Sequence, residues 1–298
     1  MAEAPESILD GVSPTVSVDP EYDFGGASFD LTRSDDRELI RFVLSQALFG
    51  EATGVYCGKS LYSARSLEAA RFYLRQARQE LNHLELFAEV FRILEMEPLP
   101  PHWTIRLLSA HNNYYPLKVL MEHAVGEGLV LDIFKDVLLQ TLPDADPRIP
   151  EIKKRLRVVC REEVEHVAWG EKETRRILAE SPWLRWPFYG LVELQMLVAP
   201  LIVRAFSRRV KAHPVLSHLP SFVAHVRARV WKQGQSLGFI PEQRPSLPVR
   251  LFAMTFGAAL FLRSQFARSH PTITDTYLQE LGFGREPLSE AGSPTARR

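Results

Sequence analysis

The stretches that decide the fold are Glu80-Leu81-Asn82-His83 and Glu163-Val164-Glu165-His166. Each has a glutamate and a histidine three residues apart, and residues at that spacing project from the same side of an α-helix. A glutamate and a histidine placed in this way can bind one metal ion together. Two such pairs therefore indicate a metal site, provided that the surrounding sequence is helical and supplies further ligands.

Long segments with helical periodicity surround both stretches. Their apolar residues recur at the spacing of an α-helix, and prolines such as Pro98 and Pro116 mark a helix end and a helix start. Ser34 is expected to cap the first helix. The four helices are expected at about 34–60, 66–96, 116–141 and 151–179.

Further helical segments follow, and no strand-type alternation of useful length interrupts them, so the sequence predicts an all-α protein. The added helices are expected at about 183–211, 217–236 and 248–268, with a short helical piece at 105–110. We expect four parts: a flexible N-terminal arm (1–33), a unit of four helices (34–181), additional helices packing on it (182–282) and a disordered tail (283–298).

Two more glutamates occupy comparable places in the other two long helices. Glu51 lies in the middle of the apolar side of the first helix, and Glu127 lies in Gly126-Glu127-Gly128 of the third. A buried carboxylate must be paired or bound to a metal, and oxygen and nitrogen ligands without thiolate suit iron or manganese. Two divalent cations would satisfy the whole set of candidate catalytic and metal-binding residues, which is Glu51, Glu80, His83, Glu127, Glu163 and His166.

This pattern resembles the ferritin-like di-iron carboxylate superfamily over about residues 35–180. The stretch Arg161–His166 is similar to the fourth-helix motif of ribonucleotide reductase small subunits and of the related ligand-binding oxidases. The resemblance implies a ferritin-like four-helix bundle with additional C-terminal helices. It also implies that Glu51, Glu80 and His83 bind one metal, that Glu127, Glu163 and His166 bind the other, and that Glu80 and Glu163 bridge them.

Three departures keep the subfamily unassigned. Phe87 stands where a radical-forming reductase subunit has a tyrosine, seven residues after the second-helix glutamate. Glu122 stands where the ligand-binding oxidases have a cross-linking tyrosine, and Val159 stands where the arylamine N-oxygenases have an extra histidine.

Several neighbours of the six residues have alternative interpretations. Glu122 competes with Glu127 as the third-helix ligand. Glu162 is either a hydrogen-bond partner of the far ring nitrogen of His83 or a surface residue. His123 either lines the site or is an ordinary core histidine, and Tyr73 either relays electrons or only packs.

Composition limits the partners and the compartment. The chain has 298 residues with 36 basic and 36 acidic groups, and this balance argues against nucleic acid or an anionic membrane as the main partner. The apolar stretches Trp186–Val203 and Leu251–Leu262 are expected to be buried helices, so membrane-surface contact is not expected. Two cysteines and no secretory signal are typical of a cytoplasmic protein.

The function expected from this site is a di-iron oxidase or oxygenase. Such an enzyme would use O2 to hydroxylate, desaturate or N- or C-oxidise a small, mostly apolar organic substrate, with two Fe ions as cofactors and manganese as the alternative in one or both positions. The electron donor stays open, and residues 183–268 either roof a substrate pocket or form a homodimer interface. Two alternatives remain: a ferroxidase or peroxide-scavenging protein in the ferritin or rubrerythrin style without an organic substrate, and a non-catalytic helical binding module.

Overall fold

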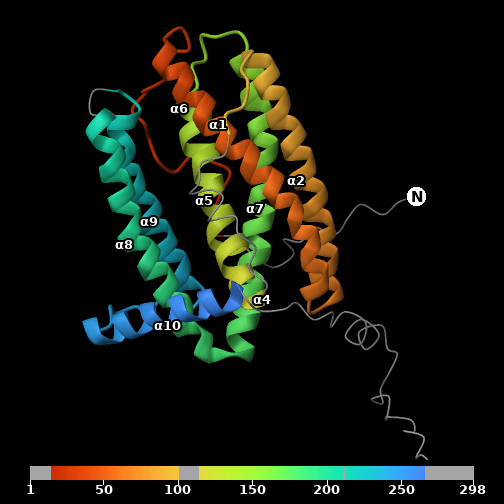
Figure 1. Ribbon diagram of the computed structural model, residues 1–298, viewed down its shortest axis with the longest axis vertical. Helices are drawn as coiled ribbons and strands as arrows, with labels where there is room; N and C mark the ends of the chain where they lie inside the picture. The colour runs from red at the N-terminus through yellow and green to blue at the C-terminus, as the bar shows by residue number, and fades with distance from the viewer. Residues whose placement is uncertain (1–14, 101–113, 211–212, 266–298) are drawn as a thin grey trace, which may run out of the picture.

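The computed structural model describes residues 15–100, 114–210 and 213–265 (Figure 1). Every regular element in these ranges is helical, which confirms the all-α prediction. The expected helical piece at 105–110 and the expected tail at 283–298 lie outside the described residues.

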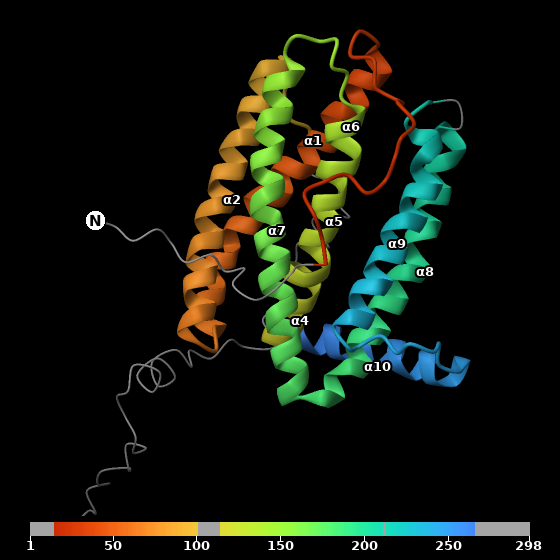
Figure 2. The same cartoon turned by 180° about the vertical axis from the view of Figure 1, so that it is seen from behind.

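Four long helical segments run alongside one another in both views (Figures 1 and 2). The first is α1 (Ser34–Gly54), which continues into the 3-10 helix η1 (Val55–Ser63); the second is α2 (Leu67–Leu94); the fourth is α7 (Ile149–Glu180). The third segment runs without a break from Tyr115 to Thr141 as α4 (Tyr115–Lys118), η2 (Val119–Gly126), α5 (Glu127–Asp132), η3 (Ile133–Leu138) and α6 (Leu139–Thr141). These bounds agree with the four expected helices to within a few residues.

Local sequence sets both ends of α2. The Ser66 hydroxyl accepts a hydrogen bond from the Ala69 amide at 3.0 Å and caps α2, and Glu95 ends α2 in the left-handed conformation with φ 52°. The expected cap at Ser34 is wrong, because α1 already begins at Ser34 and no side chain caps it. Asp36 in the first turn accepts a hydrogen bond from the Asp30 amide instead, at 2.7 Å.

The third segment departs from a regular α-helix. Both η2 and η3 are π-helical, and the amide of Glu127 donates to the carbonyl of Glu122, five residues earlier. A Cβ on Gly126 would lie 2.7 Å from the Met121 carbonyl oxygen, so the missing side chain permits this wider turn. Single π-helical turns are frequent at functional sites, and η2 ends immediately before Glu127.

Three further helices follow the four segments, as expected. They are α8 (Arg185–Val210), α9 (Leu219–Ser236) and α10 (Leu247–Gln265), with the short 3-10 turns η4 (Pro182–Leu184) and η5 (Leu216–His218) before α8 and α9. Helix α9 packs against the third segment, and α10 crosses α8 (Figure 1). Two buried contacts join α9 to the third segment. Arg229 pairs with Asp132 at 2.7 Å, and the Gln233 amide donates to the Ala124 carbonyl at 2.8 Å.

The prediction that Leu251–Leu262 is buried is wrong. Leu251, Phe252 and Leu262 are 51%, 63% and 62% exposed. In the part of the chain that the structure describes, one helical stretch, Leu247–Ser264, is long and apolar enough to cross a membrane, and 17% of it is buried. The prediction failed because periodicity shows that a helix is apolar but does not show what covers it.

The N-terminal segment is packed over residues 15–33, where the sequence predicted a loose arm. It contains no helix, but Val16, Phe24 and Phe29 are buried. The Phe29 amide donates to the Thr141 carbonyl at 2.9 Å, so this segment is held against the third helical segment. Its aromatic residues are enough to anchor it, although it lacks helical periodicity.

Candidate metal centre

All six predicted ligands meet inside the four helical segments. Five of them are at most 4% exposed, and the Glu127 side chain is 17% exposed. Their donor atoms form two groups, in each of which all atoms lie within 4.8 Å of one another. The groups are Glu51, Glu80, His83 and Glu163, and Glu80, Glu127, Glu163 and His166.

Glu80 and Glu163 belong to both groups and lie between the two imidazoles. Glu163 places Oε1 at 3.3 Å from Nδ1 of His83 and Oε2 at 3.2 Å from Nδ1 of His166. Glu80 has the same arrangement, with Oε2 at 3.9 Å from the His83 nitrogen and Oε1 at 3.6 Å from the His166 nitrogen. Each of these carboxylates therefore presents one oxygen to each half of the cluster.

Outer hydrogen bonds orient both imidazoles. Nε2 of His83 donates to the Glu162 carboxylate at 2.7 Å, and Nε2 of His166 donates to Oε1 of Gln79 at 3.0 Å. Both partners are oxygen acceptors, so each ring keeps its proton on Nε2. Nδ1 of each ring then faces the carboxylates, and it would offer a lone pair to a metal ion that displaces the proton it shares with them. This arrangement confirms the hydrogen-bond interpretation of Glu162.

The charges of the clustered carboxylates must be balanced by protons or by cations. Burial raises the pKa of Glu51, Glu80 and Glu127, and the nearby Glu163 charge raises all three further. Burial acts on Glu163 in the same direction, but the His166 charge and hydrogen bonds from both imidazoles bring its pKa below the usual value. Without cations, the cluster is neutral only if several of its members hold protons.

The pKa values of the two histidines are shifted in favour of their charged forms. Burial by itself would lower the pKa of His83, but hydrogen bonds to Glu162, Glu163 and Glu51 raise it instead. The pKa of His166 is also raised against the effect of burial, chiefly by the charge of Glu163. Protons on the imidazoles thus supply part of the positive charge that divalent cations would otherwise bring.

Sequence reasoning missed two glutamines that contact the cluster. Nε2 of Gln76 donates to Oε1 of Glu80 at 3.2 Å and to Oε1 of Glu127 at 3.0 Å, and Gln79 orients His166 as described above. Gln76 lies one helical turn before Glu80, so the same-side rule that selected His83 also points to it. No comparable rule points to Gln79, because its partner lies on another helix.

The third-segment carboxylate that joins the cluster is Glu127 and not Glu122. Glu122 is 30% exposed and pairs with the buried Lys118 at 2.5 Å, away from the two ligand groups. His123 lies at the edge of the cluster, with Nδ1 at 3.8 Å from the Glu127 carboxylate and no hydrogen-bond partner on Nε2. The structure therefore supports the interpretation that His123 lines the site.

Aromatic rings close the site on the η2 side. The rings of Phe72 and Trp169 stack at 3.8 Å, and Tyr73 lies within 5.6 Å of both His123 and Trp169. The Tyr73 hydroxyl is buried and has no hydrogen-bond partner. All three rings are buried, at most 2% exposed, so this side of the cluster is apolar.

A glycine makes room for one of the shared carboxylates. A Cβ on Gly54, the last residue of α1, would lie 2.5 Å from Oε2 of Glu80. Any larger residue at this position would displace the Glu80 side chain. The end of α1 therefore positions Glu80 as well as supplying Glu51.

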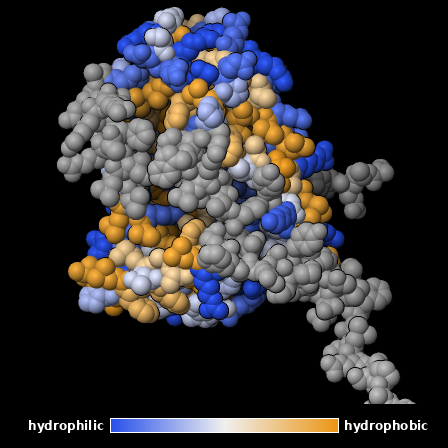
Figure 3. Space-filling model, in the orientation of Figure 1, coloured by the Kyte–Doolittle hydropathy of each residue, from blue (hydrophilic) through white to orange (hydrophobic). Residues whose placement is uncertain are grey.

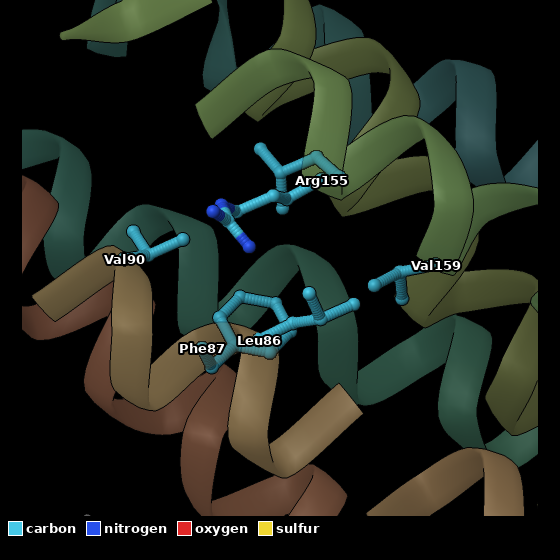
Figure 4. A pocket seen from close by; sticks show the side chains of 6 residues that line it. Leu86, Phe87, Val90, Arg155 and Val159 are labelled. Carbon is cyan, nitrogen blue, oxygen red and sulfur yellow. The ribbon is translucent and has the colours of Figure 1, made fainter. Parts of the chain in front are cut away.

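Two of the departures from the subfamily motifs lie side by side. Phe87 of α2 and Val159 of α7 line one small pocket together with Arg155 and apolar neighbours (Figure 4). The space between these side chains has no room for even a water-sized molecule, whereas small-molecule sites measure roughly 300–1,000 Å³. This corner offers no additional metal ligand and is too small to be a substrate pocket.

No family model, curated protein or solved structure matches the chain. The fold and the site therefore define the protein as an all-helical chain with a buried carboxylate–imidazole cluster that could hold metal ions.

Proposed function

We propose that the chain is a ferritin-like di-iron protein that uses O2 to oxidise a small, mostly apolar organic substrate. The observation that carries the proposal is the placement of Glu80 and Glu163, each with one carboxylate oxygen near each imidazole. A carboxylate in that position can bridge two cations. Four glutamates and two histidines from four helices form the ligand set of di-iron and di-manganese carboxylate bundles.

The donor atoms fit iron. They are carboxylate oxygens and imidazole nitrogens without thiolate, which suit iron or manganese, and manganese remains the alternative in one or both positions. Glu51 and His83 would hold one ion, Glu127 and His166 would hold the other, and the two shared glutamates would bridge. When bound, a pair of ferrous ions supplies the electrons that reduce O2.

The protein contributes orientation and a dry environment. Glu162 and Gln79 hold the two imidazoles with Nδ1 toward the ions, and Gln76 donates to one shared and one terminal carboxylate. The wall of Phe72, Tyr73 and Trp169 keeps water out. Exclusion of water protects oxidising chemistry from side reactions.

The additional helices favour an enzyme over an iron store. Arg229 and Gln233 of α9 hold the helical segment that carries Glu127 from its outer side. A bundle that only stores iron does not need this second support. Both cysteines are free and buried, which agrees with a reducing compartment such as the cytoplasm.

The experiment that tests the proposal is anaerobic loading with ferrous iron followed by rapid mixing with O2. An oxidase should take up about two irons per chain and give a transient visible absorption whose decay an added apolar substrate accelerates. Oxidation of many irons per chain would support a ferroxidase instead. Failure to take up iron would leave only a helical binding module.

A further inference from the structure

Large apolar side chains are exposed on α10 and in η4, the short turn before α8. Leu247, Leu251, Phe252 and Leu262 are between 51% and 63% exposed, and Trp183 is 48% exposed. Figure 3 shows apolar side chains at the end of the molecule where Figure 1 places α10. We call these five residues the α10 face. Exposed apolar surface of this kind marks an interaction site in a soluble fold.

The packing of α10 explains why the bulky side faces outward. α10 crosses α8 through small residues: Gly190 has no room for a Cβ against the Ala253 carbonyl, and a Cβ on Gly257 would lie 2.7 Å from the Pro187 carbonyl oxygen. Ala253 is fully buried in this crossing. The usual pattern of a surface helix, large apolar residues inward and polar residues outward, is therefore reversed.

Aromatic side chains continue the α10 face onto α8. Phe256 lies 5.9 Å from the ring of Phe252 and 6.0 Å from that of Trp183, and Trp186 is 36% exposed nearby in sequence. Tryptophan is enriched where proteins meet the headgroup region of a bilayer, because its ring is apolar and its N–H is polar.

The part of the chain that contains α8, α9 and α10 has an excess of basic residues. Residues 182–265 contain eleven Lys and Arg but only two acidic residues, whereas the whole chain has no net charge. One of the two acids, Glu193, is buried and pairs with Arg250 and Arg244. Arg185 and Arg263, near the two tryptophans and Leu262 in sequence, are exposed. Basic charge beside an apolar helix face complements an anionic surface.

We propose that the α10 face binds the surface of an anionic lipid bilayer, with α10 lying in the interface and not crossing it. The tight crossing at Ala253 holds α10 to α8, so a spanning position would require α10 to leave the fold. A symmetric contact with a second copy would bring the basic surroundings of the face against themselves, which disfavours a dimer. This proposal departs from the expectation drawn from composition, because a net charge of zero over the whole chain does not reveal the local excess of basic residues in 182–265.

The test is co-sedimentation of the full chain with lipid vesicles. Vesicles of phosphatidylcholine alone are compared with mixed vesicles of phosphatidylcholine and phosphatidylglycerol, at low and at high salt. Phe252→Glu puts a negative charge at the centre of the face. Leu74→Glu is the matched control, because Leu74 is 59% exposed on α2, outside the face. Circular dichroism checks that both variants are folded.

The wild type and Leu74→Glu should bind the mixed vesicles, and salt should weaken the binding. Phe252→Glu should lower the partition coefficient by about tenfold or more, since it removes an exposed ring that would enter the bilayer interface and adds a charge that anionic lipids repel. Absence of binding by the wild type would overturn the proposal, as would equal binding by Phe252→Glu. A concentration-dependent dimer that only Phe252→Glu abolishes, without vesicle binding, would assign the face to a second copy. None of these outcomes depends on the metal centre.

Discussion

Replacing Gly54 with alanine should weaken metal binding while leaving the protein folded. Gly54 has φ −55° and ψ −37°, which alanine adopts without strain. Alanine is favoured over glycine in a helix by up to about 1 kcal/mol. The added Cβ, however, would lie 2.5 Å from Oε2 of Glu80. Non-bonded atoms make favourable contacts at about 3.5–4.0 Å, so the carboxylate must move by about 1 Å.

That displacement is large for a metal ligand, because metal–ligand distances vary by only about 0.2 Å. We expect the affinity for ferrous or manganous ions to fall by about 10- to 100-fold, the usual effect of disturbing the surroundings of a ligand. Anaerobic calorimetric titration measures the affinity, and denaturant unfolding of the metal-free protein measures the stability.

Gly50→Ala is the matched control for this experiment. Gly50 lies one turn earlier in α1, and a Cβ there meets nothing within 4 Å. It should therefore gain stability without any loss of metal affinity. If Gly54→Ala bound metal as tightly as Gly50→Ala, Glu80 would not occupy the ligand position assigned to it.

Four further predictions address separate parts of the account. Glu127→Gln should lower the metal content, whereas Glu122→Gln should leave it unchanged. The reverse result in metal analysis would assign the ligand role in the third segment to Glu122. Glu162→Gln should weaken metal binding by about 10- to 100-fold, because it removes the carboxylate that orients one imidazole, and calorimetry would contradict this if the affinity stayed constant. Metal uptake near neutral pH should release protons, because burial raises the pKa of Glu127 and of Glu80 and metal ions replace the protons that these groups hold. Metal binding should therefore weaken as the pH falls. A pH-indicator dye that records no proton release on metal uptake would refute this prediction. Arg229→Ala should lower the free energy of unfolding by about 3–5 kcal/mol, because it leaves Asp132 buried without its partner; a loss below about 1 kcal/mol in chemical denaturation would show that the pair is dispensable.

The ligand cluster could be predicted from the sequence because helix geometry is regular. Glu80 and His83 lie on one side of α2 wherever the helix is placed, and Glu163 and His166 do the same in α7. Glu51 and Glu127 were recognisable as carboxylates in otherwise apolar helix sides. The six side chains meet as predicted, and the helix bounds differ from expectation by a few residues.

Features that depend on contacts between helices could not be predicted in the same way. The π-helical turn before Glu127 shifts a hydrogen bond by one residue, a change with no signature in residue composition. The bond between Gln79 and His166 joins two helices, so no spacing along the chain reveals it. The exposure of Phe252 depends on which side of α10 packs against α8.

The most direct test of the central claim is the metal content of the purified protein after anaerobic loading with ferrous iron and removal of unbound metal. The wild type should retain about two irons per chain. Glu80→Ala and His166→Ala should each lose most of that iron while remaining folded by circular dichroism. Retention of two irons by both variants, or none by the folded wild type, would show that the cluster does not hold the metal pair.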